Sequence, residues 1–458
     1  MANAKAGSDD IQDPLDPEER QQRYASSLNA FKTLLSFQWV SPERISANQE
    51  TCVKALVEHA IAKVPFYRER LDMLRGPDGI DLSRWLDVPL LSRTDVVNEK
   101  HALTAQEIPD RHGRTHVVRS SGTTGGRTEV LKTDLQGNVN ACSQLRFWHE
   151  AGIDWSQNLG IIRAVDPTPE EAGSDDPEAY RWGPQWLPWS SRGSLGILSV
   201  LTPPDQQLDW IEARAPIYLN TMPSNLLTLA HHVRDTGRKV SGIAGALTGG
   251  DALSHDIRRE VSRWLGIEAM DTLAAGECGR VASQCPGGGP GYHMETEANV
   301  VEVLKEDGTP CRPGETGLLT VTPLFSFAMP LIRYQFQDWV TVGEPCSCGR
   351  TSPVIADIIG RDSTLLRFRD GVRMRLELDS ERIFQMIGPR RFQIVQTSPD
   401  RIEIRIAEMR SDHPADTGAM ENYVKELAGR DIEIVSRLVP AIGTPSSGKF
   451  DRVWRSFP

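Results

Sequence analysis

The most constraining stretch of the sequence is residues 119–130, which read RSSGTTGGRTEV. A β-like lead-in, THVV, precedes this run, and a helix-like segment, Asn138–His149, follows it. Glycines let backbone N–H groups turn toward an anion, and the hydroxyl groups of serine and threonine add short donors around it. The run therefore predicts a loop that holds a polyphosphate. It lacks the Gly-Lys-Ser/Thr of a Walker A loop, and a flexible surface turn is the alternative interpretation.

Length and charge narrow the classes of protein to consider. A chain of 458 residues is too long for one ordinary core, so two or three domains are expected. The net charge of −11 argues against nucleic-acid binding, and no apolar run approaches the roughly 20 residues that span a bilayer. Residues 1–20 are predicted to be a disordered acidic tail without the pattern of a signal peptide. We expect a cytoplasmic protein with no membrane or nucleic-acid partner, and we leave open whether it forms a homodimer.

The order of the expected elements indicates an α/β fold. Strand-like segments such as Gly160–Val165 and Ala215–Leu219 alternate with helix-like ones such as His255–Leu265, as in parallel sheets. Between Asn299 and Val342, period-two alternation with turn residues predicts hairpins or a small barrel. We therefore predict a large multi-subdomain N-terminal domain over residues 21–360, with parallel sheets and a β-barrel-like part. A small α+β C-terminal domain is predicted over residues 361–458.

The phosphate-loop run resembles a known family. SSGTTGGRT is similar to the loop of the acyl-adenylate-forming superfamily, usually written [ST]SGTTGxPT, with Gly126 here at the usual lysine position. The words VPFYRERL and LDVPLLSRTDV resemble the N-terminal helices of its phenylacetate–CoA ligase branch, and the resemblance covers nearly the whole chain. It implies that the ATP-binding residues of the loop are Ser120, Ser121, Gly122, Thr123, Thr124, Gly125 and Arg127, with Thr123 also catalytic.

A second motif resembles the adenine-side turn of the superfamily. Residues 248–254 read TGGDALS, in which Gly249 and Gly250 would allow close approach of a planar base. The resemblance implies that Asp251 accepts a hydrogen bond from the exocyclic amine of adenine. A strand-to-helix turn capped by Ser254 is a compatible interpretation.

A third motif, DTLAAGECG at residues 271–279, occupies the position of the family's YGxTE sequence. The resemblance implies that Glu277 holds Mg²⁺ between the nucleotide phosphates together with Thr124, for which one or two oxygen ligands suffice. Leu273 replaces the usual aromatic residue, and Gly276 replaces the usual threonine or serine.

The remaining motifs of the resemblance supply ribose and phosphate contacts. MPLIRYQFQDWV implies that Asp338 accepts from both ribose hydroxyl groups, and Arg361 of the following Gly-Arg pair would also contact ribose. Ser363 stands where the family has its hinge aspartate. TPSSGKFDRV resembles the SxGKxxR motif, which makes Lys449 the catalytic lysine. An ammonium group at that point stabilises the extra charge on phosphorus in the transition state more than in the ground state.

Three of the seven cysteines and one histidine suggest a metal site. Cys285 and His293 have the spacing C-x7-H, and Cys346 and Cys348 follow as C-x-C. Three thiolates and one imidazole suit tetrahedral structural Zn²⁺, and the phenylacetate–CoA ligase branch has a similar pattern. An odd number of cysteines argues against disulfides. Unliganded thiols are the alternative, and Cys278 or Cys311 could replace one ligand.

The acid-binding residues are predicted only from their position between motifs. The candidates are Trp189, Asn220, Met222, Ala274 and Ala275. Trp189 belongs to RWGPQWLPW with Trp182 and Trp186, a cluster for which packing of an insertion is favoured over a wall of an acyl pocket.

What the family resemblance implies is ATP-dependent activation of a carboxylic acid, aromatic by family likeness, as acyl-AMP with release of pyrophosphate. Transfer to coenzyme A would follow, so the implied cofactors are ATP, Mg²⁺, coenzyme A and structural Zn²⁺. Two alternatives stay open. One is transfer of the acyl group to an amine or another nitrogen nucleophile, and the other is an inactive nucleotide-binding or scaffold protein.

Overall fold

The structure is a computed structural model that describes residues 17–119, 128–164, 181–184, 186–187, 191–289, 291–408, 414–445 and 447–457, with the backbone alone for residues 17–24. Its α-helices are α1 (Pro17–Phe37), α2 (Pro42–Lys63), α3 (Arg93–Asn98), α4 (Lys100–Leu103), α5 (Asp134–Glu150), α6 (Pro204–Arg214), α7 (Pro223–Thr236), α8 (His255–Leu265), α9 (Ser380–Ile387) and α10 (Thr417–Ala428).

The strands begin with four short ones near the N-terminus, continue with those of a large sheet, and end with those of the C-terminal region. They are β1 (Arg75–Gly76), β2 (Gly79–Ile80), β3 (Thr115–Arg119), β4 (Glu129–Thr133), β5 (Leu159–Arg163), β6 (Leu195–Ser199), β7 (Tyr218–Thr221), β8 (Gly245–Gly249), β9 (Ala269–Ala275), β10 (Gly279–Gln284), β11 (Tyr292–Met294), β12 (Asn299–Leu304), β13 (Thr316–Pro323), β14 (Tyr334–Val342), β15 (Val354–Arg361), β16 (Leu366–Arg367), β17 (Arg373–Met374), β18 (Phe392–Ser398), β19 (Arg401–Ala407), β20 (Glu433–Val439) and β21 (Val453–Arg455).

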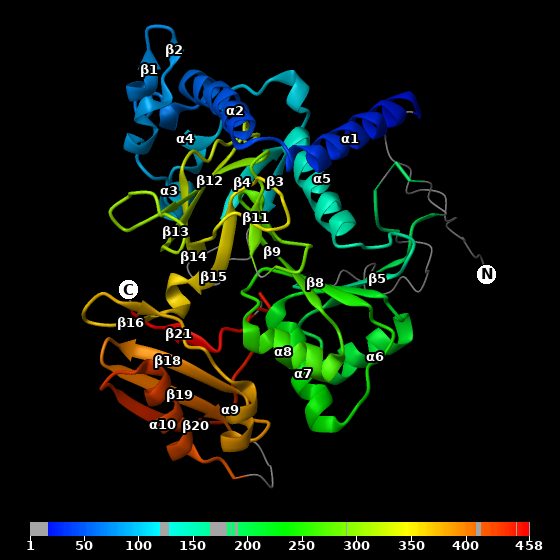
Figure 1. The fold of residues 1–458 in the computed structure, drawn as a ribbon, viewed down its shortest axis with the longest axis vertical. Helices are drawn as coiled ribbons and strands as arrows, with labels where there is room; N and C mark the ends of the chain where they lie inside the picture. The colour runs from blue at the N-terminus through cyan, green and yellow to red at the C-terminus, as the bar shows by residue number, and fades with distance from the viewer. Residues whose placement is uncertain are drawn as a thin grey trace, which may run out of the picture.

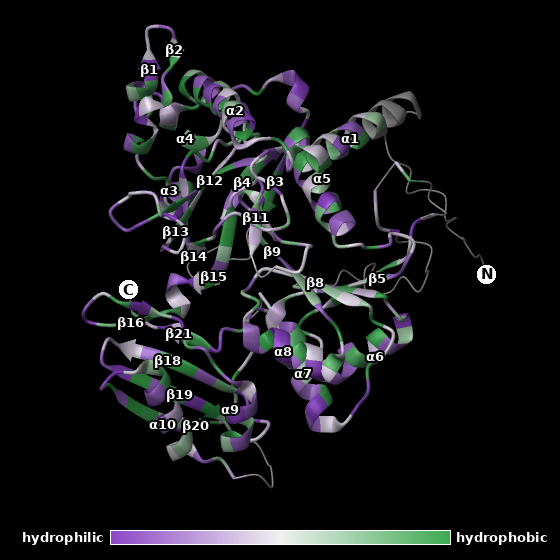
Figure 2. Ribbon diagram, in the orientation of Figure 1, coloured by the Kyte–Doolittle hydropathy of each residue, from purple (hydrophilic) through white to green (hydrophobic). Residues whose placement is uncertain are grey.

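An 11-stranded sheet runs through the centre of the molecule (Figure 1). One part of it is parallel, in the order β6-β5-β7-β8-β9. Helices α6, α7 and α8 connect successive strands of this part, and their apolar residues form one core cluster with the strands. The helices are half-buried, so they carry both hydrophobic and hydrophilic residues (Figure 2). The predicted α/β class with parallel strands is confirmed.

The other part of the same sheet is antiparallel. Strand β10 pairs antiparallel with both β9 and β11, so the sheet continues through β15, β14 and β13 to β12 at its edge. The hairpins predicted between Asn299 and Val342 are present as β12–β13–β14. They extend the large sheet instead of curling into the predicted barrel-like part, and the described strands form no closed barrel.

Helix α2 shows how local sequence sets the N-terminal elements. The Ser41 side chain accepts from the backbone of Arg44, and Pro42 takes the first helical position, where a missing N–H costs nothing. Leu56, Val57 and Ala60 are fully buried against the antiparallel part of the sheet. Pro65, which lacks the N–H that another turn would need, follows the helix end at Lys63.

Helix α1 begins at Pro17, so residues 17–20 are helical and not part of the predicted tail. Proline suits the first turn of a helix, and the two glutamates that follow favour its positive N-terminal end. Residues 1–16 lie outside the described residues. No helix among the described residues has both the length and the apolar character needed to cross a bilayer.

The C-terminal region has its own sheet and its own core. Strands β20-β19-β18-β21 form a four-stranded mixed sheet, on which α9 and α10 pack through Ile383, Met420 and Val424. In Figure 1 this sheet lies below the large one, with α9 beside α8. The predicted boundary at residue 361 falls at the end of β15. A functional division of the chain at this point stays a prediction.

Candidate active site

A cavity of about 800 Å³ lies between the large sheet and the C-terminal region. Its walls include the residues that follow β8 and β9, which end at the same edge of the sheet because the two strands are parallel. Ligands in open α/β sheets bind outside the carboxyl ends of such strands. The predicted site residues that line this cavity are Gly250, Asp251, Ala274, Ala275, Glu277, Asp338, Arg361 and Lys449.

The Gly250–Asp251 turn and Lys449 lie against each other. Gly250 has a φ of +103°, and a methyl group built on it would lie 3.7 Å from Cε and 3.9 Å from Nζ of Lys449. Asp251 Oδ1 accepts from the backbone N–H of Ser224 at 3.4 Å, while Oδ2 is buried and has no protein partner. Burial raises the pKa of Asp251 to about 6, against the opposing effects of Ser224 and Lys449. A carboxylate with an open hydrogen-bonding position therefore faces the cavity beside the lysine.

Asp338 and Arg361 form another wall of the cavity. They are cross-strand partners on β14 and β15, and Arg361 Nε lies 3.9 Å from Asp338 Oδ1. Burial raises the pKa of the Asp338 carboxyl, while Arg361 and Lys449 lower it. Burial and Arg361 lower the pKa of Lys449, whereas Asp251 and Asp338 raise it. The lysine therefore sits within the electrostatic reach of both walls.

Glu277 lies at the turn between β9 and β10 and is buried, with 8% of its surface exposed. Leu273 and Gly276, the two departures from the family motif, line the cavity with it. Gly249, the last residue of β8, is not among the described lining residues. A methyl group built on it would lie 3.0 Å and 3.1 Å from two oxygens of Thr272.

Several predicted residues fall in parts of the chain that the structure does not describe. They are Ser120, Ser121, Gly122, Thr123, Thr124, Gly125, Arg127 and Trp189. Their placement is therefore untested. The flanking strands β3 and β4 form an antiparallel hairpin, and Arg119 at the end of β3 lines the cavity. Arg119, the first residue of the 119–130 run, therefore lies at the cavity wall.

The candidates for acid binding separate into two groups. Ala274 and Ala275 line the cavity. Asn220 and Met222 are not among the described lining residues. Asn220 Oδ1 accepts from Arg163 Nε at 3.1 Å, and Met222 lies beside Gly448, the residue before Lys449. Their predicted role in acid binding is not tested by this arrangement.

The tryptophan cluster packs as the favoured interpretation predicts, for the two members that are described. Trp182 is buried, donates from Nε1 to the carbonyl of Gln157 at 2.7 Å and meets Trp148 edge-on. Trp186 packs against Phe31 of α1 with ring centroids 5.3 Å apart. Both side chains hold the insertion to the body of the protein.

Other cavity residues were not found by sequence reasoning. Arg93 and Tyr334 line the cavity, and Arg93 Nε donates to Thr128, the last residue of SSGTTGGRT. The sequence LSRTDV could have predicted the position of Arg93, since Ser92 and Asp95 form a capping box that starts α3 at Arg93. Asp362 was also not singled out from the sequence. Asp362, one residue before Ser363, is a carboxylate there and accepts from Arg373 Nε at 2.7 Å.

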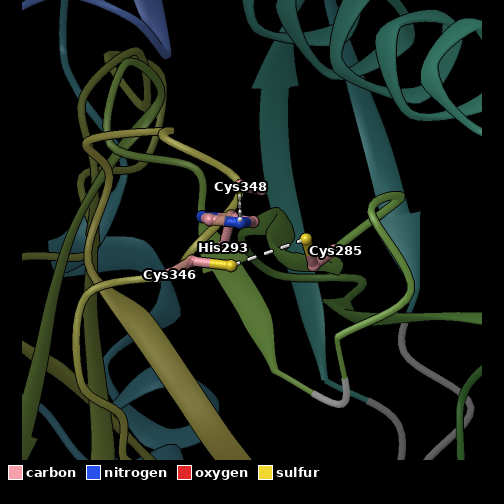
Figure 3. Close-up of side chains that lie close together, drawn as sticks. All are labelled: Cys285, His293, Cys346 and Cys348. Carbon is pink, nitrogen blue, oxygen red and sulfur yellow. Dashed lines mark hydrogen bonds between the residues drawn. The ribbon is translucent and has the colours of Figure 1, made fainter.

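The four predicted zinc ligands come together (Figure 3). Their ligand atoms all lie within 4.8 Å of one another, with Cys285 Sγ 3.7 Å from Cys346 Sγ and Cys348 Sγ 3.3 Å from His293 Nε2. Tetrahedral zinc with ordinary bond lengths would place such pairs about 3.8 Å and 3.6 Å apart. The other ring nitrogen of His293 lies 3.4 Å from Ser352 Oγ, which would fix the imidazole as outer-shell groups do. The donor set and its spacing therefore fit zinc.

Comparisons with known proteins give sequence relatives and structural neighbours. No protein-family model matches the sequence. The chain is 27% identical over 344 residues to the phenylacetate–coenzyme A ligase of Thermus thermophilus, covering 71% of this chain and 72% of that protein. It is 25% identical over 361 residues to the phenylacetate–coenzyme A ligase of Escherichia coli, covering 76% and 78%.

Solved structures share the fold. A crystal structure of 2-hydroxyisobutyryl-CoA ligase in the postadenylation state matches with a TM-score of 0.69 at 17% identity, covering 91% of each chain. An anthranilate CoA ligase in complex with anthranoyl-AMP matches with a TM-score of 0.52 at 14% identity, covering 73% of this chain and 66% of that one. The sequence relatives support the resemblance read from the motifs, which is to the phenylacetate–CoA ligase-like branch of the acyl-adenylate-forming superfamily.

Proposed function

We propose that the protein is an AMP-forming acid–coenzyme A ligase. In the first step a carboxylate oxygen of the acid attacks the α-phosphorus of ATP, and pyrophosphate leaves with the electron pair of the broken P–O bond. In the second step the thiol of coenzyme A attacks the acyl carbon, AMP leaves, and the thiol proton passes to solvent. An aromatic acid is favoured because two relatives are named phenylacetate–coenzyme A ligases.

The observation that carries this proposal is the meeting of Lys449 with the Gly250–Asp251 turn in one cavity with Asp338 and Arg361. These residues come from four separate motifs, spread over about 200 positions of the sequence. An ammonium group near a nucleotide phosphate would stabilise the charge that develops as the carboxylate attacks. Asp338 would hold the ribose, and Asp251 would accept from adenine.

The residues present also fit the implied metals. Glu277 is a buried carboxylate at the cavity and would be a ligand of Mg²⁺, which neutralises phosphate charge when it is bound. Cys285, His293, Cys346 and Cys348 would hold structural zinc. All four positions would be filled by protein ligands, so the zinc would have no open position for chemistry. A mobile C-terminal domain, a homodimer and a cytoplasmic location are further parts of the proposal, of which light scattering would test the dimer.

The test is pyrophosphate release by the purified protein with ATP, Mg²⁺ and a panel of aryl and alkyl acids, phenylacetic acid included. We expect release with at least one aromatic acid and formation of the thioester when coenzyme A is added. ATP binding without release for every acid would contradict the proposal and favour an inactive nucleotide-binding protein. Acyl transfer to amines in preference to coenzyme A would instead replace the second step.

A further inference from the structure

We infer that Asp256 is a positioning residue for the catalytic lysine, acting through Arg452. This inference rests on the proposed function, since it concerns how Lys449 is held. Asp256 belongs to the first turn of α8, under the large sheet, whereas Arg452 lies three residues after Lys449 in the C-terminal region. The pair therefore ties the lysine-bearing segment to the part of the protein that carries the Gly250–Asp251 turn.

The contacts of Asp256 are unusually complete for a carboxylate between two parts of a chain. Its Oδ2 accepts from Arg452 at 3.0 Å and from the Ser380 hydroxyl at 2.6 Å. Its Oδ1 accepts from the backbone N–H of Ser380 at 3.0 Å and from Arg259 at 2.7 Å. Only 5% of Asp256 and 15% of the Arg452 side chain are exposed. Removing one charge of a buried, hydrogen-bonded pair leaves the other charge buried without its partner, which costs considerable free energy.

The surroundings favour a negative charge at this point. Asp256 follows Ser254, the N-cap of α8, and Ser380 is the first residue of α9. The carboxylate thus lies at the N-terminal ends of two helices, where backbone N–H groups and the helix dipoles are positive. Arg452 also donates to the Ser380 hydroxyl at 3.1 Å, which closes a triangle of Asp256, Ser380 and Arg452.

A second contact fixes the other side of the lysine. Gly448 has a φ of +72°, and a methyl group there would lie 2.2 Å from Val200 and 3.0 Å from Met222. The backbone before Lys449 is therefore pressed against the ends of β6 and α7, and Arg452 holds the backbone after it. Beyond Arg452 the chain enters β21, which pairs with β18 of the C-terminal sheet. With both ends held, Lys449 Nζ is directed to the Gly250 turn, and removing one hold would displace it.

The test uses Asp256→Asn, which keeps the size of the side chain and an oxygen for Ser380 but removes the charge that faces Arg452. We expect the turnover of pyrophosphate release with ATP and phenylacetic acid to fall on the order of 10²-fold, because a displacement of about 1 Å has that effect on a catalytic group. The KM values should change by less than about threefold. The rate of thioester formation from synthetic phenylacetyl-AMP and coenzyme A should also change by less than about threefold. No pyrophosphate leaves in this half-reaction, so it does not need the charge of Lys449 at that step.

Arg452→Gln, which removes the other charge of the pair, should likewise slow pyrophosphate release and leave thioester formation nearly unchanged. Arg263→Gln is the matched control, because Arg263 pairs with Glu381 across the same α8–α9 contact at 2.8 Å but is 51% exposed. It should leave both half-reactions unchanged. Equal losses in both half-reactions, or a wild-type rate of pyrophosphate release in Asp256→Asn, would overturn the inference.

Hydrogen exchange gives a readout that does not depend on activity. In Asp256→Asn the amides of residues 447–453 should exchange faster, while those of β18, β19 and β20 keep their wild-type rates. Unchanged exchange at 447–453 would overturn the inference even if no acid were accepted by the wild-type protein. Faster exchange there in a protein that releases no pyrophosphate would instead sink the proposed function and leave the positioning contact established.

Discussion

Asp338 and Arg361 lie directly opposite each other on the antiparallel strands β14 and β15, with 3.9 Å between the guanidinium Nε and the carboxylate Oδ1. At this separation the two groups attract each other without forming a close hydrogen bond, so oxygens of the Asp338 carboxylate are left for a ligand. Two ribose hydroxyl groups would be suitable donors. Because the two residues are cross-strand partners in one sheet, the backbone fixes their relative position before any nucleotide binds.

Asp338→Asn should therefore weaken nucleotide binding more than it slows the chemical step. Hydrogen bonds to a charged group contribute about 1.5–3 kcal/mol, which corresponds to roughly 10- to 100-fold in the KM for ATP. Steady-state pyrophosphate release at varied ATP measures this effect. Asp357→Asn is the control, because Asp357 lies on the same strand β15 but pairs with Arg375 at 2.9 Å, away from Asp338. An unchanged KM for ATP in Asp338→Asn would refute the ribose role.

Lys449→Ala should act on turnover instead of on binding. Removing a group that stabilises charge mainly in the transition state costs on the order of 10²–10³ in rate. Single-turnover formation of acyl-AMP, followed with radiolabelled ATP, measures the step directly. Lys425→Ala is a suitable comparison, since Lys425 is an exposed lysine of the same C-terminal region, paired with Asp431. A Lys449→Ala protein that forms acyl-AMP at the wild-type rate would remove the central residue of the proposed mechanism.

Elements with a strong local pattern were predictable from the sequence. Helix α8 spans His255–Leu265 as predicted, because Ser254 caps it and Gly266 ends it in the left-handed conformation. The bounds of strand β7 were less predictable from the sequence. It runs Tyr218–Thr221 and not Ala215–Leu219, since Ala215 takes a φ of +44° as the C-cap of α6 and cannot start a strand. A positive φ at alanine is rare, and no local sequence pattern predicts it here.

The site shows the same division between local motifs and long-range contacts. Lys449 and Asp338 were found through short motifs, and the structure brings both to one cavity. Asp256 was not predicted as a site residue, because an aspartate in the first turn of a helix is common and needs no functional explanation. Its role depends on Arg452, 196 positions further along the chain, and on the packing of α8 beside α9. Such a pairing is set by the tertiary fold, which no single-sequence pattern encodes.

Replacing one thiol of the cysteine and histidine cluster should remove its metal. The wild-type protein, purified without added metal, should contain about one zinc ion per chain, and Cys346→Ser should contain almost none. Elemental analysis measures the content. Because structural zinc contributes to folding free energy, Cys346→Ser and chelator-treated protein should both unfold at a lower temperature. Cys52→Ser, at a half-buried thiol of α2 outside the cluster, should keep both the metal and the unfolding temperature. Wild-type protein free of zinc would contradict the assignment.

The buried carboxyl of Asp251 should make stability fall as pH rises. Burial raises its pKa to about 6 in the folded protein, from an ordinary value of 3.8. Between these two values the folded state holds a proton that the unfolded state releases, so folding is favoured at the acidic end of the window and that advantage is lost as pH passes 6. The asparagine of Asp251→Asn does not ionise, so the cost of ionising a buried carboxyl group above pH 6 is absent in this variant. Its stability relative to wild type should therefore increase from about pH 4.5 to about pH 7, by about 2 kcal/mol.

Urea unfolding of both proteins across that range measures the difference. Asp307→Asn is an informative control, because the Thr309 side chain and backbone lower the pKa of Asp307. The stability that this carboxylate contributes is present above its ordinary value and is lost only at more acidic pH, so Asp307→Asn should show no rise with pH in the same window. A flat difference for Asp251→Asn would mean that the Asp251 carboxyl ionises at its ordinary pH. The environment beside Lys449 would then be wetter than its burial implies, and the ammonium would act on phosphate through water, with a weaker effect on the rate.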